Sequence, residues 1–183
     1  MANEITMQSL TSWIRECARV IIENNDALNE LDSSMGDADH GSNLHRGFVA
    51  VTDALDREGP EDPLSLFKLV GMTLVSTVGG SSGALYGTLF LRMASTCKEI
   101  RHLDDKSLLN ALRAGLEGVI ERGNAKAGDK TMYGSLAPAV VAFEDEINKG
   151  NAINISLQAA ANAADLGAKS TKAMLARKGR ASY

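Results

Sequence analysis

The chain of 183 residues contains few aromatic residues, three prolines and two cysteines. Because only 4% of the residues are aromatic, aliphatic side chains and methionine must fill most of the core. No run of 18 apolar residues occurs, so no transmembrane helix is predicted. The N-terminus lacks the basic region of a signal peptide. Cys17 and Cys97 lie in apolar periodic stretches, so we expect buried thiols rather than a disulfide, and a cytoplasmic protein.

The chain also lacks a basic balance and the common nucleotide-binding motifs. Its net charge is -4 and its pI is about 5.4, which argues against binding nucleic acid through a general basic surface. Neither GxxxxGK[ST] nor GxGxxG in a βαβ setting occurs. The length predicts one domain over residues 1–183, large enough for a proper core.

Apolar residues recur at spacings of three and four along most of the chain, and no convincing strand is present. Asp104 or Asp105 is expected to cap one helix, and Pro138 should kink another or mark its first turn. Helices of this length with mostly short connections predict an all-α, up-and-down antiparallel fold. The seven predicted helices span roughly 5–24, 43–57, 64–78, 84–100, 105–122, 132–148 and 155–178.

Many of the 17 glycines fall in three connections, at 36–41, 79–83 and 123–128. If the helices alternate in direction, the connections after the first, third and fifth predicted helices lie at the same end. These are the three glycine-rich connections. The sequence therefore predicts a single site, built from loops, at one rim.

The first of these connections, "DSSMGDADHG", carries Asp32, Asp37 and Asp39. Three carboxylates on a short loop repel one another unless a cation is present, and hard oxygen ligands suit Mg²⁺ or Ca²⁺. The spacing does not match the twelve-residue calcium loop, so Mg²⁺ shared with phosphate is favoured over solvated turn residues. For His40 we prefer a phosphate-binding or loop-ordering role to acid–base chemistry. Asn43 is either a helix N-cap or a ligand contact.

The other two connections suit an anion and a flat ring. In "GGSSG", glycines let the backbone curl around an anion, while Ser81, Ser82 and the start of a helix add donors. Flexible-linker composition is an equally good interpretation of this motif alone. In "GNAKAGDKTM", Lys126, Lys130 and Thr131 can bind phosphate, and Met132 can pack on a base. The alternatives are an ordinary turn, and a core methionine.

Four segments together resemble one protein family. "GDADHGSNLHRGF", "TVGGSSGALYGT", "RGNAKAGDKTM" and "ARKGRASY" are similar, in this order, to the nucleotide-binding L subunit of dihydroxyacetone kinases. The closest similarity is to the stand-alone subunit of the phosphotransferase-system type, which depends on phosphoenolpyruvate. The resemblance spans residues 5–183 and implies an eight-helix up-and-down barrel with the nucleotide at one rim.

The resemblance also implies roles for individual residues. Asp32, Asp37 and Asp39 would hold two Mg²⁺ ions that bridge the phosphates of ADP or ATP. The residues implied to contact the nucleotide are His40, Gly41, Ser42, Asn43, Ser81, Ser82, Gly123, Met132 and Arg180. No covalent catalytic residue is expected in this chain, because in this family a histidine of the K subunit holds the substrate.

The sequence departs from the family in two places. Gly134 stands where the family usually has Asp, which puts the role of that Asp in doubt. The family also continues beyond the position of Tyr183 through a lid loop and an eighth helix, so we expect the chain to lack both and to belong to a longer one. Seven helices would leave apolar surface exposed in an eight-helix barrel.

Three functions remain open at this stage. In the first, bound ADP accepts a phosphoryl group from the phosphohistidine M subunit and passes it to dihydroxyacetone on the K subunit. An ATP-dependent kinase subunit is the alternative within that class. The second is an ADP-sensing module that docks on a transcriptional regulator. The third is a structural helical protein whose acidic loops bind nothing.

Overall fold

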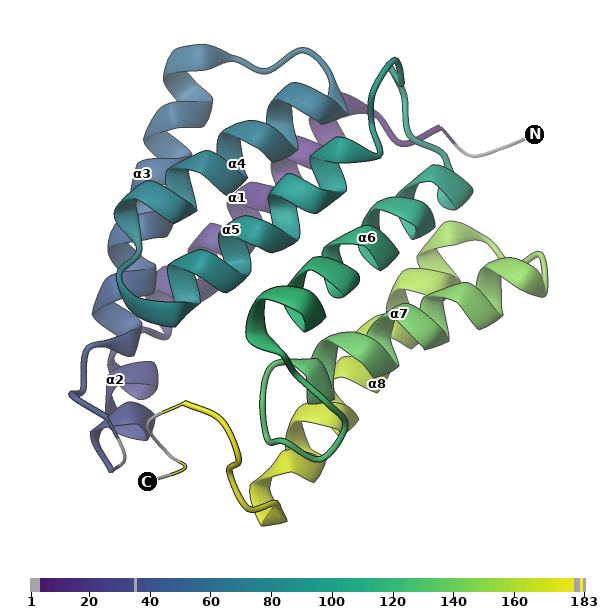
Figure 1. Ribbon diagram of the computed structural model, residues 1–183. Helices are drawn as coiled ribbons and strands as arrows, with labels where there is room; N and C mark the ends of the chain where they lie inside the picture. The colour runs from purple at the N-terminus through teal and green to yellow at the C-terminus, as the bar shows by residue number, and fades with distance from the viewer. Residues whose placement is uncertain (1–3, 35, 180–181, 183) are drawn as a thin grey trace.

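A computed structural model describes residues 4–34, 36–179 and 182 of the chain, and these residues form helices without any strand (Figure 1). The helices are α1 (Met7–Glu23), α2 (Asn25–Ser33), α3 (His40–Glu58), α4 (Pro63–Thr77), α5 (Gly80–Ser95), α6 (Asp105–Gly123), α7 (Tyr133–Asn148), α8 (Ile153–Ser170) and the 3₁₀ turn η1 (Thr171–Ala173). The all-α class and the antiparallel order are therefore confirmed. None of the described helices is long and apolar enough to cross a membrane.

The helix count and two boundaries near the rim differ from the prediction. We predicted seven helices, whereas the described residues contain eight, because α2 lies in the segment that was assigned to the acidic connection. The helix after "GGSSG" begins at Gly80 rather than at residue 84, so both serines lie in its first turn. The last helix ends at Ser170 rather than at residue 178. The prediction placed Arg177 and Lys178 in the last turn of this helix. In the structure both residues lie beyond its end.

Local sequence explains where several helices begin. Asp104 is the N-cap of α6, and its side chain accepts a hydrogen bond from the backbone N–H of Ser107 at 2.8 Å, as predicted for one of the two candidate caps. Asp62 caps α4 in the same way through Ser65, and Pro63 occupies the first position of that helix. In both cases the backbone N–H of the capping aspartate donates in turn to the serine hydroxyl oxygen. The two reciprocal bonds fix the direction in which the chain enters the helix.

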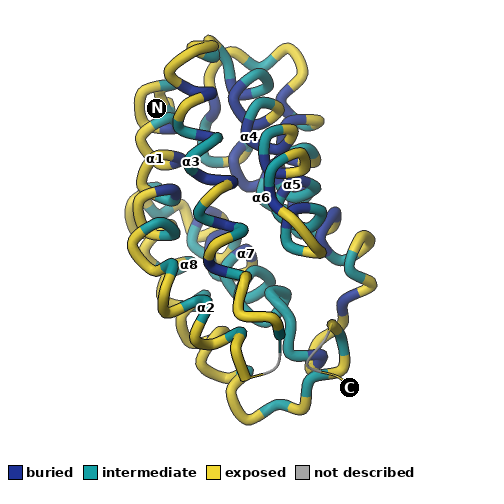
Figure 2. Tube along the Cα trace, turned by 90° about the vertical axis from the view of Figure 1, so that its left-hand side faces the viewer, coloured by how far each residue is buried: buried dark blue, intermediate teal, exposed yellow. Residues whose placement is uncertain are grey.

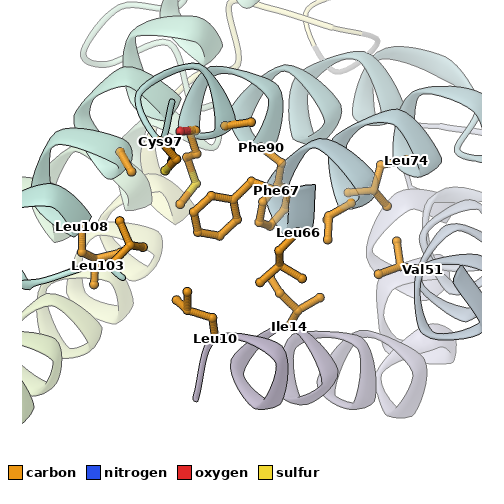
Figure 3. Close-up of a cluster of buried hydrophobic side chains, with 14 of the residues drawn as sticks. Leu10, Ile14, Val51, Leu66, Phe67, Leu74, Phe90, Cys97, Leu103 and Leu108 are labelled. Atoms are coloured by element: carbon orange, nitrogen blue, oxygen red, sulfur yellow. Dashed lines mark hydrogen bonds between the residues drawn. The ribbon is translucent and has the colours of Figure 1, made fainter. Parts of the chain in front are cut away.

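The core lies between α1, α3, α4 and α5 and extends to α6 and α7. Figure 3 shows Ile14, Leu66 and Phe67 converging there, with Cys97 close by. Trp13 packs edge-on against Phe67, with ring centroids 6.3 Å apart. Phe48, Phe90 and Phe143 are also buried, and most of the remaining interior is aliphatic, as the low aromatic content predicts.

The helix α8 is less covered than the other long helices. It buries only Ser156 and Gly167, while Ile155, Leu157 and Leu166 are exposed. Around the α8 label, Figure 2 shows mainly the colours of exposed and intermediate residues. Apolar side chains of α8 are therefore exposed in the described part of the chain.

The pair α7 and α8 is held in unusually close contact. Pro138 lies inside α7 and has no N–H to bond the carbonyl of Gly134. That carbonyl faces Gly167 of α8 so closely that a Cβ on Gly167 would overlap its oxygen. A Cβ on Gly134 would in turn lie 2.7 Å from the Thr171 methyl group. This approach supplies a physical reason for glycine at position 134, where the sequence departs from the family.

The three glycine-rich connections lie where the helices end. Figure 1 shows that the connections before α3, before α5 and before α7 all lie at one end of the molecule. The segment after α8 also runs to this end, toward α2. The predicted convergence at a single rim is therefore found in the structure.

Candidate functional site

The acidic residues form a cluster at this rim. Asp32 lies in the last turn of α2, while Asp37 and Asp39 lie in the connection to α3. One carboxylate oxygen of each lies within 4.8 Å of the others. The backbone N–H of Asp39 donates to Oδ2 of Asp32 at 3.2 Å, which ties the two ends of the connection together. Ala38 has a φ of 58°, a left-handed conformation that allows the tight path between the aspartates.

This cluster has the properties of a cation site. Three negative charges this close repel one another in the absence of a cation. Asp32 is also placed at the negative end of the α2 dipole, where a carboxylate is disfavoured. Oxygen-only donors suit Mg²⁺ better than a transition metal. The residues present therefore fit a hard divalent cation.

The serine loop, residues 79–83, lines the same cavity as the acidic cluster. Gly79 is the N-cap of α5 and has no side chain that could accept hydrogen bonds from the first backbone N–H groups of this helix. Gly80 has a φ of 66°, a conformation that glycine adopts readily. Ser82 Oγ lies 3.2 Å from Nδ1 of His40, which links the first turns of α3 and α5. The arrangement offers backbone and hydroxyl donors to an anion.

A cavity of about 770 Å³ joins these elements. Its wall includes the acidic cluster, the serine loop, the start of α7 and the segment after α8. The residues that line it are Leu28, Leu31, Asp32, Asp37, Asp39, His40, Asn43, Gly79, Gly80, Ser81, Ser82, Lys130, Thr131, Met132, Ser135, Ala168, Thr171, Lys178 and Gly179.

A second cavity of about 460 Å³ adjoins the first and is more apolar. Leu85 and Tyr86 of α5, Val119 and Gly123 of α6, and Met132 lie on its wall. Burial raises the pKa of the Tyr86 phenol, so this side chain is neutral at physiological pH. The two cavities share His40, Ser81, Ser82, Thr131, Met132, Lys178 and Gly179. Together they offer a charged compartment beside an apolar one.

Most of the predicted site residues line these cavities, but two of them do not. Gly41 lies against the backbone of α2, where a Cβ would overlap the carbonyl oxygen of Asn25. Ser42 bonds to Asn29, its backbone N–H donating to Oδ1 at 3.0 Å and its Oγ accepting from Nδ2 at 2.9 Å. Both residues therefore join α2 to α3 in this structure. Arg180 lies outside the described residues.

The N-cap interpretation of Asn43 is wrong. Asp39 is the N-cap of α3, and Asn43 lies four residues further along, inside the helix. Its Oδ1 accepts a hydrogen bond from Arg46 at 2.6 Å, and the residue lines the larger cavity. The alternative of a ligand contact stays a prediction.

Sequence reasoning missed the contribution of α2 and the role of Lys178 in the C-terminal segment. Leu28 and Leu31 of α2 line the larger cavity, and their spacing of three residues was the available signal. Lys178 lines both cavities, although it was predicted to be the last residue of a helix. Lys130 donates from Nζ to the carbonyl oxygens of Lys172 at 3.2 Å and Met174 at 3.1 Å.

Comparison with known proteins identifies the family. The model of the DAK2 domain matches residues 34–183. The ADP-binding subunit DhaL of PEP-dependent dihydroxyacetone kinase from Escherichia coli K12 is 38% identical over 98% of this chain and 85% of its own. The corresponding subunit of kinase 1 from Listeria innocua is 39% identical, over 93% of this chain and 80% of its own.

A solved structure has a similar fold. The dihydroxyacetone kinase of C. freundii in complex with AMP-PNP and Mg²⁺ superposes with a TM-score of 0.77 at 26% identity. The match covers 93% of this chain and 30% of the kinase chain, so this chain corresponds to about a third of that enzyme. With the family match and the near full-length relatives, the chain belongs to the DAK2 domain family.

Proposed function

We propose that the chain is the ADP-binding subunit of a phosphoenolpyruvate-dependent dihydroxyacetone kinase, a phosphotransferase. The main observation in support of this proposal is that an acidic cluster, a helix N-terminus and an apolar cavity lie together at one rim. Relatives that match nearly the whole chain are named as such subunits. A third relative, from Lactococcus lactis, is named as PTS-dependent and is 37% identical over 98% of this chain.

Asp32, Asp37 and Asp39 would hold the metal, and we propose two Mg²⁺ ions. When bound, Mg²⁺ neutralises phosphate charge and orients the oxygens for in-line transfer. The serine loop and His40 would bind the phosphates, because their donors face the same cavity as the carboxylates. Gly123 and Met132 would border the base in the apolar cavity. We keep Gly41, Ser42, Asn43 and Arg180 as further nucleotide contacts in the proposal.

This chain would bind and align rather than form a covalent bond. His40 engages Ser82 through Nδ1, which suits a role in fixing the phosphate loop. In the proposed cycle the M subunit's phosphohistidine is the phosphoryl donor and dihydroxyacetone on the K subunit is the final acceptor. The chain holds the ADP that carries the group between them, so it contributes charge neutralisation and positioning.

The setting of this cycle is also part of the proposal. Cys17 and Cys97 are free thiols, which suits the reducing cytoplasm. A transcriptional regulator is not included, because none of the relatives compared above is named for one. An ATP-dependent kinase remains the alternative, since the C. freundii enzyme of similar fold is bound to a triphosphate analogue.

Reconstitution separates the two kinases. The chain is mixed with K and M subunits, dihydroxyacetone and a phosphoenolpyruvate-driven relay, with ADP no more abundant than the chain. We expect sustained formation of dihydroxyacetone phosphate, and no turnover when the K subunit is omitted. If turnover requires ATP in stoichiometric amounts and phosphoenolpyruvate has no effect, the chain serves an ATP-dependent kinase instead.

A further inference from the structure

The connection between α6 and α7 holds the segment that follows α8. We name residues 172–179, which begin within η1, the C-terminal strap. Lys130 Nζ donates to the carbonyl oxygens of Lys172 and Met174, near the start of the strap. The backbone N–H of Arg177 donates to the carbonyl oxygen of Asp129 at 3.2 Å. Three hydrogen bonds therefore join the strap to two adjacent residues that lie more than 40 positions earlier in the chain.

The connection itself is built to present these two residues. Asp129 is buried, and its Oδ2 accepts from the backbone N–H of Lys126 at 2.9 Å, which closes the loop. Lys130 has a φ of 57°, a conformation that costs a non-glycine residue about 1 kcal/mol or more. Such a conformation persists only where surrounding contacts hold it. The bonds to the strap are the contacts that the side chain makes.

The position of the strap matters to the cavities. Lys178 lies on it and, among the described residues, is the only lysine or arginine that lines both cavities. Nothing in the helices places Lys178 there, because α8 ends at Ser170 and the chain then leaves the helical path. The course of the strap is instead set by its bonds to Lys130 and Asp129.

We propose that Lys130 is a positioning residue that holds the C-terminal strap, and through it Lys178, against the nucleotide cavities. This inference rests on the proposed function for its consequence, tighter binding of a nucleoside diphosphate. An ammonium group has three N–H donors, and the strap carbonyls take two of them. Lys130 therefore acts on the ligand mainly through Lys178, whose charge stands at the junction of the polar and apolar compartments.

The first test is hydrogen–deuterium exchange of the strap in the protein without nucleotide. In Lys130→Met, amides of residues 174–179 should exchange several-fold faster than in the parent, because the strap has lost two of its three bonds. Lys130→Arg should restore slow exchange, since its guanidinium can donate to the same carbonyls. Lys126→Met is the matched control, because Lys126 is exposed in the same connection and lines neither cavity. Equal exchange in the parent and in Lys130→Met overturns the proposal.

The second test is a double-mutant cycle with MgADP, measured by calorimetry. Lys130→Met and Lys178→Met should each weaken binding roughly tenfold, the scale of one charge-assisted hydrogen bond. In the Lys178→Met background, Lys130→Met should add less than about twofold, because both changes remove the same contribution. Fully additive effects would make Lys130 a direct ligand and overturn the positioning role. If the parent binds no MgADP, the proposed function fails, while the exchange result still decides whether Lys130 holds the strap.

Discussion

Replacing one aspartate of the acidic cluster should have opposite effects with and without Mg²⁺. In Asp32→Asn the side chain keeps its shape and an oxygen that can accept the bond from the Asp39 N–H. Two unit charges 4.8 Å apart repel by about 0.9 kcal/mol in a water-like dielectric, which suits these partly exposed groups. Asp32 has two such neighbours, so without metal the variant should gain about 1–2 kcal/mol in the free energy of unfolding.

In the presence of Mg²⁺ the same substitution should be unfavourable, because it weakens the binding of MgADP. Each carboxylate attracts a divalent cation about twice as strongly as a single charge. At an effective dielectric constant of 20 this attraction is several kcal/mol. The neutral oxygen of asparagine retains only a part of it. A net loss of about 3 kcal/mol corresponds to roughly a hundredfold weaker binding of MgADP.

Urea unfolding in EDTA measures the first effect, and calorimetric titration of MgADP measures the second. Asp53→Asn is the matched control, because Asp53 is exposed on α3 and lies about 20 Å along the helix from its N-terminus. The reasoning is refuted if Asp32→Asn is less stable than the parent in EDTA, or if it binds MgADP as tightly as the parent does.

Three further changes test the fold. Gly167→Ala should lower the free energy of unfolding by about 1–3 kcal/mol in thermal melts, because its methyl group would overlap the Gly134 carbonyl; an unchanged melt contradicts the close α7–α8 contact. The side-chain and backbone bonds from Ser107 lower the pKa of Asp104, so its cap stabilises the fold above the unfolded pKa of about 4 and is lost as the pH falls through the lower folded value. Asp104→Ala should therefore cost about 1 kcal/mol at neutral pH and progressively less at pH 3 and below, measured by urea unfolding; a pH-independent cost contradicts this. Burial raises the pKa of the Cys97 thiol, so a disulfide reagent at pH 8 should label it only on unfolding, and rapid labelling of the native protein would argue against the core placement.

The long helices and the rim could be predicted because their signals are local. Apolar spacing predicted α1 and α6, and a single acidic cap predicted where α6 begins. Alternation of helix direction then predicted that the three glycine-rich connections would meet. Each of these inferences uses residues within one helix or one connection, so no long-range contact had to be known.

The parts that were missed depend on contacts between distant residues. The helix α2 has nine residues and buries none of them fully, so its apolar period is too short to detect. The helical composition of the last segment predicted continuation to residue 178. In the structure the strap carbonyls bond Lys130 instead, across more than 40 positions. The same applies to Ser42, whose bonds to Asn29 depend on the unpredicted α2.

Calorimetric titration of ADP into the purified chain, with Mg²⁺ and again with EDTA, tests the central claim most directly. The acidic cluster and the serine loop line one cavity, and phosphate can lie beside the carboxylates only when their charge is neutralised. We predict one ADP per chain in the presence of Mg²⁺, with binding lost in EDTA. Absence of ADP binding in both conditions, or equal affinity in both, would contradict the account.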